Sequence, residues 1–379
     1  MPGVRVIEAP EVPGSAPLGV IHDRRAGPAW SAILRIEGRS FALLDAADKE
    51  RRLAAWGALL ASLGRPGSPI HRVQWVERSA EGTSDQLQRY LDTAVCGGVV
   101  PAARVSYEQL IEGAGPATQS HEALLVISIH PRHAARAIRS FGRGEAAVCE
   151  LLAREVRLLC GQARGGELPG LSAMSALEVN DALALGVGPV APAPRTTIFP
   201  AQAFQPTGFA PAWPMATDEA WAAVRADDAW LATFWVAEWP RLDVGPDFLS
   251  PLLLAGGCRA VSVVMAPVDP QRAVREAGSA RTADLADEEL RRRAGFVPST
   301  RRRREAEGVV QREVELADGH GEYRFSGYVT VVGADRKGLE VACAEVEQAA
   351  RRAHLELRRL YGRQAEALTW TLPLGRGLS

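Results

Sequence analysis

The residues best suited to chemistry lie in one stretch near the end of the chain, from Ser299 to Phe325. Five of its six arginines, Arg301, Arg302, Arg303, Arg304 and Arg312, are candidate contact residues. Guanidinium groups bind phosphate, so such a run is typical of nucleic-acid contacts. The arginines are interspersed with four acidic residues, Glu305, Glu307, Glu313 and Glu315. Charge runs of mixed sign usually form salt-bridged, solvated helix faces, and we therefore interpret these arginines as a protein-contacting arm, with nucleic acid as the alternative.

The apolar positions of this stretch are few. Val309, Val310 and Val314 form a thin stripe, and the preceding segment, Gln271 to Gly295, has a similarly thin, alanine-rich stripe. Two such helices can pack on one another but hardly on a large core. We therefore predict a projecting helical hairpin over residues 271–319.

The stretch ends in an Asp-Gly-His-Gly-Glu sequence, Asp318 to Glu322. Its imidazole and carboxylates could transfer protons or bind a metal ion. Gly319 and Gly321, however, are expected where a helix ends and the chain turns into a strand. We interpret the sequence as that turn; an enzyme that works through His320 and Glu322 is a third hypothesis, which requires both side chains to face one pocket.

Other motifs of catalysis are missing from the sequence. Neither lysine, Lys49 or Lys337, lies in a P-loop, and there is no G-x-S-x-G sequence. His130 and His133 form an H-x-x-H pair with Pro131 between them, but local spacing suggests no third metal ligand. We predict no catalytic, cofactor or metal site, and hence a protein that is not an enzyme.

Tryptophans 221, 230, 235 and 239 offer a further candidate site. Exposed rings of this kind can stack on nucleic-acid bases. Three of them fall within a segment that is apolar on both faces, as a central strand is, so we interpret them as core residues.

Composition indicates a globular protein of two domains. The chain has 379 residues, of which 47% are hydrophobic and 23% charged, and its formal net charge is −1. A net charge so close to zero does not attract nucleic acid or anionic lipid to the protein as a whole. Any charged partner must therefore bind to a local patch of charged residues.

Cysteine usage and hydropathy indicate a soluble chain in a reducing compartment. The five cysteines lie far apart with no C-x-x-C pair, which is typical of buried thiols. The strongest membrane-span candidate, Phe248 to Val268, is interrupted by proline, glycine and arginine. We predict a short helix, a turn and a buried strand there.

The periodicities of the two halves of the chain predict the same order of elements. Residues 1–185 are predicted to form, in this order, a strand, a helix over Ala46 to Gly64, a strand, a helical insert, a strand from His121 and a helix. Residues 215–379 repeat this order, with the arm as the insert, a helix over Asp335 to Gly362 and a last strand over Ala367 to Leu374. Residues 186–214 contain seven prolines and form the connection.

We therefore predict an α/β (α+β) protein of two lobes. Each lobe is expected to be a split βαβ-like sandwich, and the repeated order suggests an internal duplication.

A resemblance to a known family rests on the residues that follow the arm. Glu315, Leu316, Gly319 and His320, with the later Leu372-Pro373-Leu374, resemble the region just before the motor of the conjugative, type IV secretion ATPases. The whole chain more closely resembles an actinobacterial membrane-protein family that accompanies such ATPases. It is more distantly similar to the E component of type VII secretion.

The resemblance implies a scaffold subunit, tethered to the membrane and facing the cytoplasm, that docks a motor ATPase and small membrane subunits. The sequence ends at Ser379, where the motor proteins continue into a P-loop, so ATPase activity is not expected. The family's apolar N-terminal helices do not occur in the sequence either. A DNA-handling module that uses the arginine-rich arm is the alternative.

Overall fold

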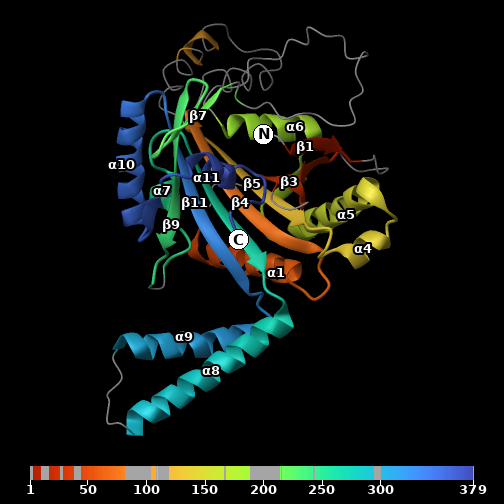
Figure 1. The fold of residues 1–379 in the computed structure, drawn as a ribbon, viewed down its shortest axis with the longest axis vertical. Helices are drawn as coiled ribbons and strands as arrows, with labels where there is room; N and C mark the ends of the chain where they lie inside the picture. The colour runs from red at the N-terminus through yellow and green to blue at the C-terminus, as the bar shows by residue number, and fades with distance from the viewer. Residues whose placement is uncertain are drawn as a thin grey trace.

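The computed structural model describes residues 3–9, 17–25, 29–37, 44–81, 104–107, 109, 119–165, 168–187, 214, 216–241, 244–293 and 300–378. Side chains at 81, 284, 288, 291, 292 and 300–306 are outside the description as well. The twelve described strands form one antiparallel sheet with helices on both faces, which confirms the α+β class (Figure 1). Most of the predicted helical insert after residue 82 and of the proline-rich connection lie outside the described residues.

The first half of the chain supplies six strands and four helices to this description. In chain order they are β1 (Val4–Glu8), β2 (Gly19–Asp23), β3 (Ala29–Glu37), α1 (Ala46–Leu63), β4 (Ile70–Glu81), β5 (Gln119–Ile129), α4 (Ala135–Arg139), α5 (Gly144–Gly165), β6 (Gly170–Ala173) and α6 (Ala176–Leu185). Predicted helix 46–64 corresponds to α1, whose N-cap Asp45 accepts a hydrogen bond from the backbone N–H of Asp48.

The second half of the chain supplies the remaining described elements. They are β7 (Thr217–Glu219), β8 (Val224–Ala226), β9 (Ala229–Glu238), α7 (Ser250–Leu253), β10 (Arg259–Pro267), α8 (Pro270–Arg293), α9 (Thr300–Ala317), β11 (Tyr323–Gly333), α10 (Arg336–Arg352), β12 (Glu356–Arg359) and α11 (Gln364–Thr371). The predicted short helix, turn and buried strand within Phe248 to Val268 are confirmed as α7 and β10.

The two halves of the chain share the sheet instead of forming separate sandwiches. The order β3-β5-β4 of the first half is matched by β9-β11-β10 of the second, and β4 pairs with β10 where the halves meet. Val76 lies opposite Ser262 at the centre of this pairing. The prediction of two separate sheets was wrong because each half leaves one strand edge unpaired, and the two edges pair with each other.

Alternating side chains of the strands form a core on each face of the sheet. Leu125 and Ile127 of β5 pack in one cluster with α5, whereas Leu124 and Val126 pack in another with α6 and α11. In a third cluster, buried side chains of α10 pack against those of β9 and β11. The sheet is thus buried on both faces along its middle strands.

The end of the chain differs from the prediction. Predicted helix 335–362 ends at Arg352, and His354, with φ +58°, turns the backbone so that residues 356–359 pair with β9 as β12. The predicted last strand is a helix, α11, followed by a segment of bends. Short apolar runs do not distinguish strand from helix, and pairing with a distant strand decides between them.

Residues 372–378 form a segment that polar side chains of the sheet hold in place. Gln74 accepts a hydrogen bond from the Gly375 N–H at 2.7 Å and donates to the Leu372 carbonyl at 3.0 Å. Arg72 donates to the carbonyls of Gly375 and Leu378 at 2.8 and 2.6 Å. Because Gln74 also donates to Ser262 of β10, the segment is tied to both halves of the sheet.

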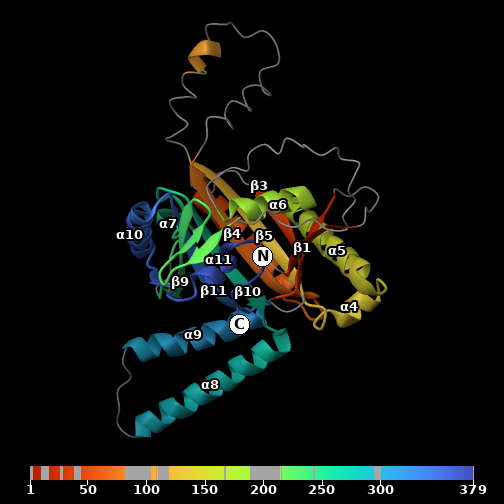
Figure 2. The same ribbon diagram turned by 45° about the horizontal axis from the view of Figure 1, so that its top comes forward.

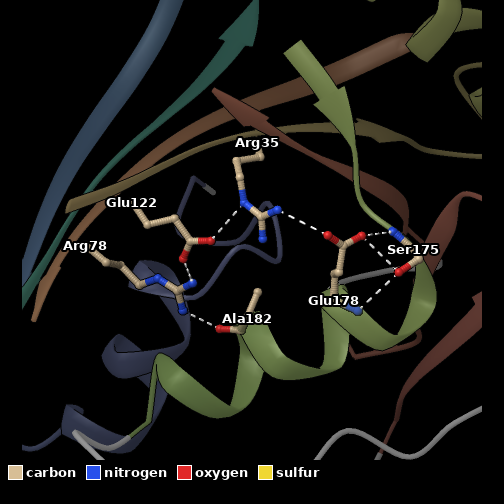
Figure 3. A network of polar contacts seen from close by, with 6 residues as sticks. All are labelled: Arg35, Arg78, Glu122, Ser175, Glu178 and Ala182. Carbon is tan, nitrogen blue, oxygen red and sulfur yellow. Dashed lines mark hydrogen bonds and ion pairs between the residues drawn. The ribbon is translucent and has the colours of Figure 1, made fainter. Parts of the chain in front are cut away.

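A second polar network ties α6 to the first half (Figure 3). Arg35 of β3 contacts Glu122 at 3.4 Å and Glu178 at 3.1 Å, and Arg78 of β4 bonds to Glu122 and to the Ala182 carbonyl. Glu178 also closes a capping box with Ser175. Hydrogen bonds from the Ser175 backbone are the main cause of a lowered pKa at Glu178. The network therefore fixes the start and the middle of α6 on the sheet.

Candidate interaction arm

The predicted helical hairpin is confirmed by α8 and α9. The two helices run antiparallel and project from the strand ends of β10 and β11, away from the rest of the molecule (Figures 1 and 2). The 24 residues of α8 correspond to about 36 Å at ~1.5 Å per residue. We call residues 270–319 the arm.

The base of the arm is fixed to the body. Arg312 donates two hydrogen bonds to Glu322, at 3.1 and 2.5 Å, and the Tyr323 hydroxyl donates to the Leu60 carbonyl of α1 at 2.5 Å. A Cβ atom at Gly321 would lie 3.1 Å from the Ala61 Cα, so this glycine permits the close approach to α1. The predicted contact residue Arg312 thus serves to hold the base.

The Asp-Gly-His-Gly-Glu sequence forms the predicted turn. Gly319 has φ +90°, and the His320 N–H donates to the Glu315 carbonyl at 2.9 Å, which caps the end of α9. The His320 side chain is exposed and that of Glu322 is bound by Arg312. The structure therefore places these residues in a helix stop and an ion pair, and neither lines the cavity described below.

The seam between α8 and α9 is narrow. Ala273 and Ala277 are buried at its base, and farther out Arg281 of α8 bonds to Glu313 of α9. The acidic side chain of Glu313 therefore pairs across the hairpin and not with an arginine of its own helix. On α9, Leu316 is half-buried and Ala317 is exposed, so both of these buried alanines belong to α8.

Five aliphatic side chains of the arm are exposed. They are Val274, Leu285 and Leu290 on α8, with exposed fractions of 56%, 57% and 66%, and Val310 and Val314 on α9, with 45% and 47%. We call Val274, Leu285 and Val310 the aliphatic face. Of the predicted stripe on α9, Val309 is half-buried, whereas Val310 and Val314 are exposed.

The aliphatic face lies on one side of the hairpin. Val274 precedes Arg281 by seven residues, Leu285 follows it by four, and Val310 precedes Glu313 by three. Positions separated by three, four or seven residues lie on one side of a helix. Because Arg281 and Glu313 are bonded to each other, Val274, Leu285 and Val310 share the side of the arm that carries this ion pair.

The predicted contact residues Arg301 to Arg304 lie in the first turn and a half of α9, at the free end of the arm. Their side chains are outside the described part of the structure. Arg291, Arg292 and Arg293 end α8, so a second arginine run also lies at the free end of the arm. The end of α8 and the start of α9 stand apart there (Figures 1 and 2).

The remaining sequence candidates do not assemble into a site. His130 lies with its ring centroid 5.6 Å from that of His71. Among the described residues, no group of three or more histidine, cysteine, aspartate or glutamate side chains is placed to hold a metal ion. Cys149, Cys160 and Cys343 are buried thiols, as predicted, whereas Cys258 is only partly buried and Cys96 lies outside the described residues.

The tryptophans divide between core and surface. Trp230 and Trp239 pack against the third core cluster, as predicted. Trp221 is largely exposed and stacks on Tyr361, and Trp235 is partly exposed in a cavity wall. The core interpretation was therefore wrong for Trp235, while Trp221 lies outside the segment to which it applied.

His71 makes the stability of the fold depend on pH. Burial lowers its pKa from an ordinary 6.5 to about 4, while its bond to the Ser128 carbonyl opposes the shift. The unfolded chain takes up this proton near pH 6.5, so the stability is full above that pH. It is expected to fall between pH 6.5 and about 4 by up to about 1.4 kcal/mol per pH unit.

The variant His71→Gln tests this dependence through urea unfolding at pH 7 and pH 5. The wild type is expected to lose more unfolding free energy between the two pH values than the variant does. Equal losses would show that His71 is not the group responsible.

The arm can bind a partner along its aliphatic face while its base stays fixed. Sequence reasoning predicted the arm but did not identify Val274 and Leu285. The signal that could have identified them was an aliphatic residue on a helix side that otherwise carries charged residues.

Among the described residues, no helix is long and apolar enough to cross a membrane. Comparisons with protein-family models and with curated proteins found no match to this chain.

Proposed function

We propose that this chain is a structural subunit of an actinobacterial secretion or conjugation apparatus of the type IV or type VII kind. The arm docks a motor ATPase, and the body contacts small membrane subunits on the cytoplasmic side of the cell membrane. The sequence resemblance at Glu315 to His320 and at Leu372 to Leu374 supports this choice of apparatus and partner.

The observation that carries the proposal is the exposed aliphatic face on an arm with a fixed base. Val274, Leu285 and Val310 are exposed on two helices whose base is held to the body by the Arg312–Glu322 pair. Helices with exposed aliphatic side chains at such spacings bind grooves in partner proteins. A fixed base limits the conformational entropy that docking removes.

Co-purification from the native cells tests the proposal. The tagged chain is recovered at physiological salt after mild detergent extraction, and its partners are identified by mass spectrometry. A motor ATPase and membrane subunits are expected in stoichiometric amounts. Recovery of neither class of partner would overturn the proposal.

DNA binding by the free end of the arm is the second candidate function. It is favoured by residues 291–293 and 301–304, seven arginines in all, which lie at the free end of the arm. It requires binding of a duplex oligonucleotide that weakens steeply with salt, and replacement of Arg301 to Arg304 by alanine should then reduce both the affinity and the salt slope. Binding that is the same in this variant and in the wild type would exclude the candidate.

A further inference from the structure

A cavity of about 980 Å³ lies on the face of the sheet that carries α11 and residues 372–378. Trp235 of β9, Tyr328 of β11 and Trp370 of α11 all line it. Its size is near the upper end of small-molecule pockets, which span about 300–1,000 Å³.

The charged side chains that line the cavity are mostly arginines. They are Arg25, Arg72, Arg363 and Arg376, with Glu366 as the one acid. Arg363 is bonded to Glu366 at 2.9 Å and Arg376 to Asp23 at 2.6 Å. These two carboxylates offset two of the four positive charges, so the cavity favours an anionic ligand.

Arg72 makes the strongest case for an anion. Both of its terminal nitrogens donate to backbone carbonyls, those of Gly375 and Leu378, and its Nε is buried with no hydrogen-bond partner. Burial lowers the pKa of this guanidinium. A partly buried positive charge that is met only by carbonyl dipoles is stabilised when an anion binds beside it.

The aromatic rings of the cavity are held in position before any ligand binds. The Trp235 indole N–H donates to the Ser326 hydroxyl at 3.0 Å, and 38% of this residue is exposed. The Trp370 ring lies 4.9 Å from Tyr328 and 5.4 Å from the Arg363 guanidinium. Rings fixed in this way favour a ligand with a planar ring of its own.

We propose that this cavity binds a nucleoside phosphate. The base stacks on Trp235, and the phosphate groups accept hydrogen bonds from Arg363 and Arg72. Each guanidinium has five N–H donors, so both retain donors beside the bonds already described. This binding site is separate from the arm and does not depend on the function proposed for it.

Titration of the full chain with ATP, followed by calorimetry at physiological salt, tests the site. Saturable binding with one site per chain is expected, and adenosine and pyrophosphate should each bind at least tenfold more weakly than ATP. The variants Arg363→Gln and Trp235→Leu should each weaken ATP binding about tenfold. Arg358→Gln is the matched control, because this exposed arginine of β12 does not line the cavity.

Thermal unfolding of each variant shows whether it is folded before its affinity is compared. Absence of saturable ATP binding to the wild type would overturn the proposal. Affinities that Arg363→Gln and Trp235→Leu leave unchanged would also overturn it. Pyrophosphate that binds as tightly as ATP would contradict the assignment of the ring site.

Discussion

Replacing Arg376 by methionine is expected to lower the free energy of unfolding by about 3–5 kcal/mol. Arg376 donates to both carboxylate oxygens of Asp23, at 2.6 and 2.8 Å, and Asp23 is 0% exposed. Removal of the guanidinium takes this bidentate ion pair away from a fully buried carboxylate. The same substitution removes the link between residues 372–378 and β2. The lost free energy of unfolding therefore includes part of the packing of these residues on the sheet.

Urea unfolding at pH 7 measures this loss. Arg358→Met is the control, since Arg358 forms an exposed pair with Glu356 at 2.9 Å, and such pairs contribute about 0–1 kcal/mol. Adding Asp23→Asn to Arg376→Met should recover part of the stability, because a neutral amide costs less to bury than a carboxylate. Equal losses in Arg376→Met and Arg358→Met would show that the buried pair does not stabilise the fold.

The double substitution Leu285→Asp and Val310→Asp is expected to weaken binding of the motor ATPase by at least about a hundredfold. Both side chains belong to the aliphatic face, and a carboxylate in a docked apolar groove loses its hydration without gaining a partner. The fold itself should be unaffected, because both positions are exposed in the free chain.

Val341→Asp on α10 is the matched control for this double substitution. Val341 is an exposed valine on a helix, 54% accessible, but it lies on the body and not on the arm. Circular dichroism and the melting temperature check that each variant is folded, and calorimetry gives the affinities. The arm is not the docking element if the double variant binds as tightly as Val341→Asp.

Local sequence signals predicted those parts of the fold that depend on local interactions. α1 has a capping aspartate and a terminal glycine, β9 is an apolar run, and Phe248 to Val268 contains its own turn residues. The sheet that joins the halves could not be predicted, because the β4-β10 register pairs residues that are 180 or more positions apart. β12 was missed for the same reason, since its pairing with β9 is visible only in three dimensions.

The candidate site shows the same division. The arm and its turn could be predicted from thin apolar stripes and from Gly319, but the outward side of each helix could not. The Arg281–Glu313 ion pair shows how α8 and α9 are aligned and therefore which side chains share one side of the arm. This alignment cannot be inferred from the sequence. The cavity could not be predicted at all, because Arg72, Trp235, Tyr328 and Arg363 come from four separate elements and loops.

Removal of the arm tests its role most directly. Val268 donates to the Glu322 carbonyl at 2.9 Å, so the β10-β11 pairing continues to these residues and an Asn-Gly turn can replace residues 269–321. Capture of the motor ATPase is then measured in parallel with the wild-type chain and with this armless chain. Capture by the wild type alone is the expected result, with both chains equally folded. Equal capture by the two chains would contradict the proposed role of the arm.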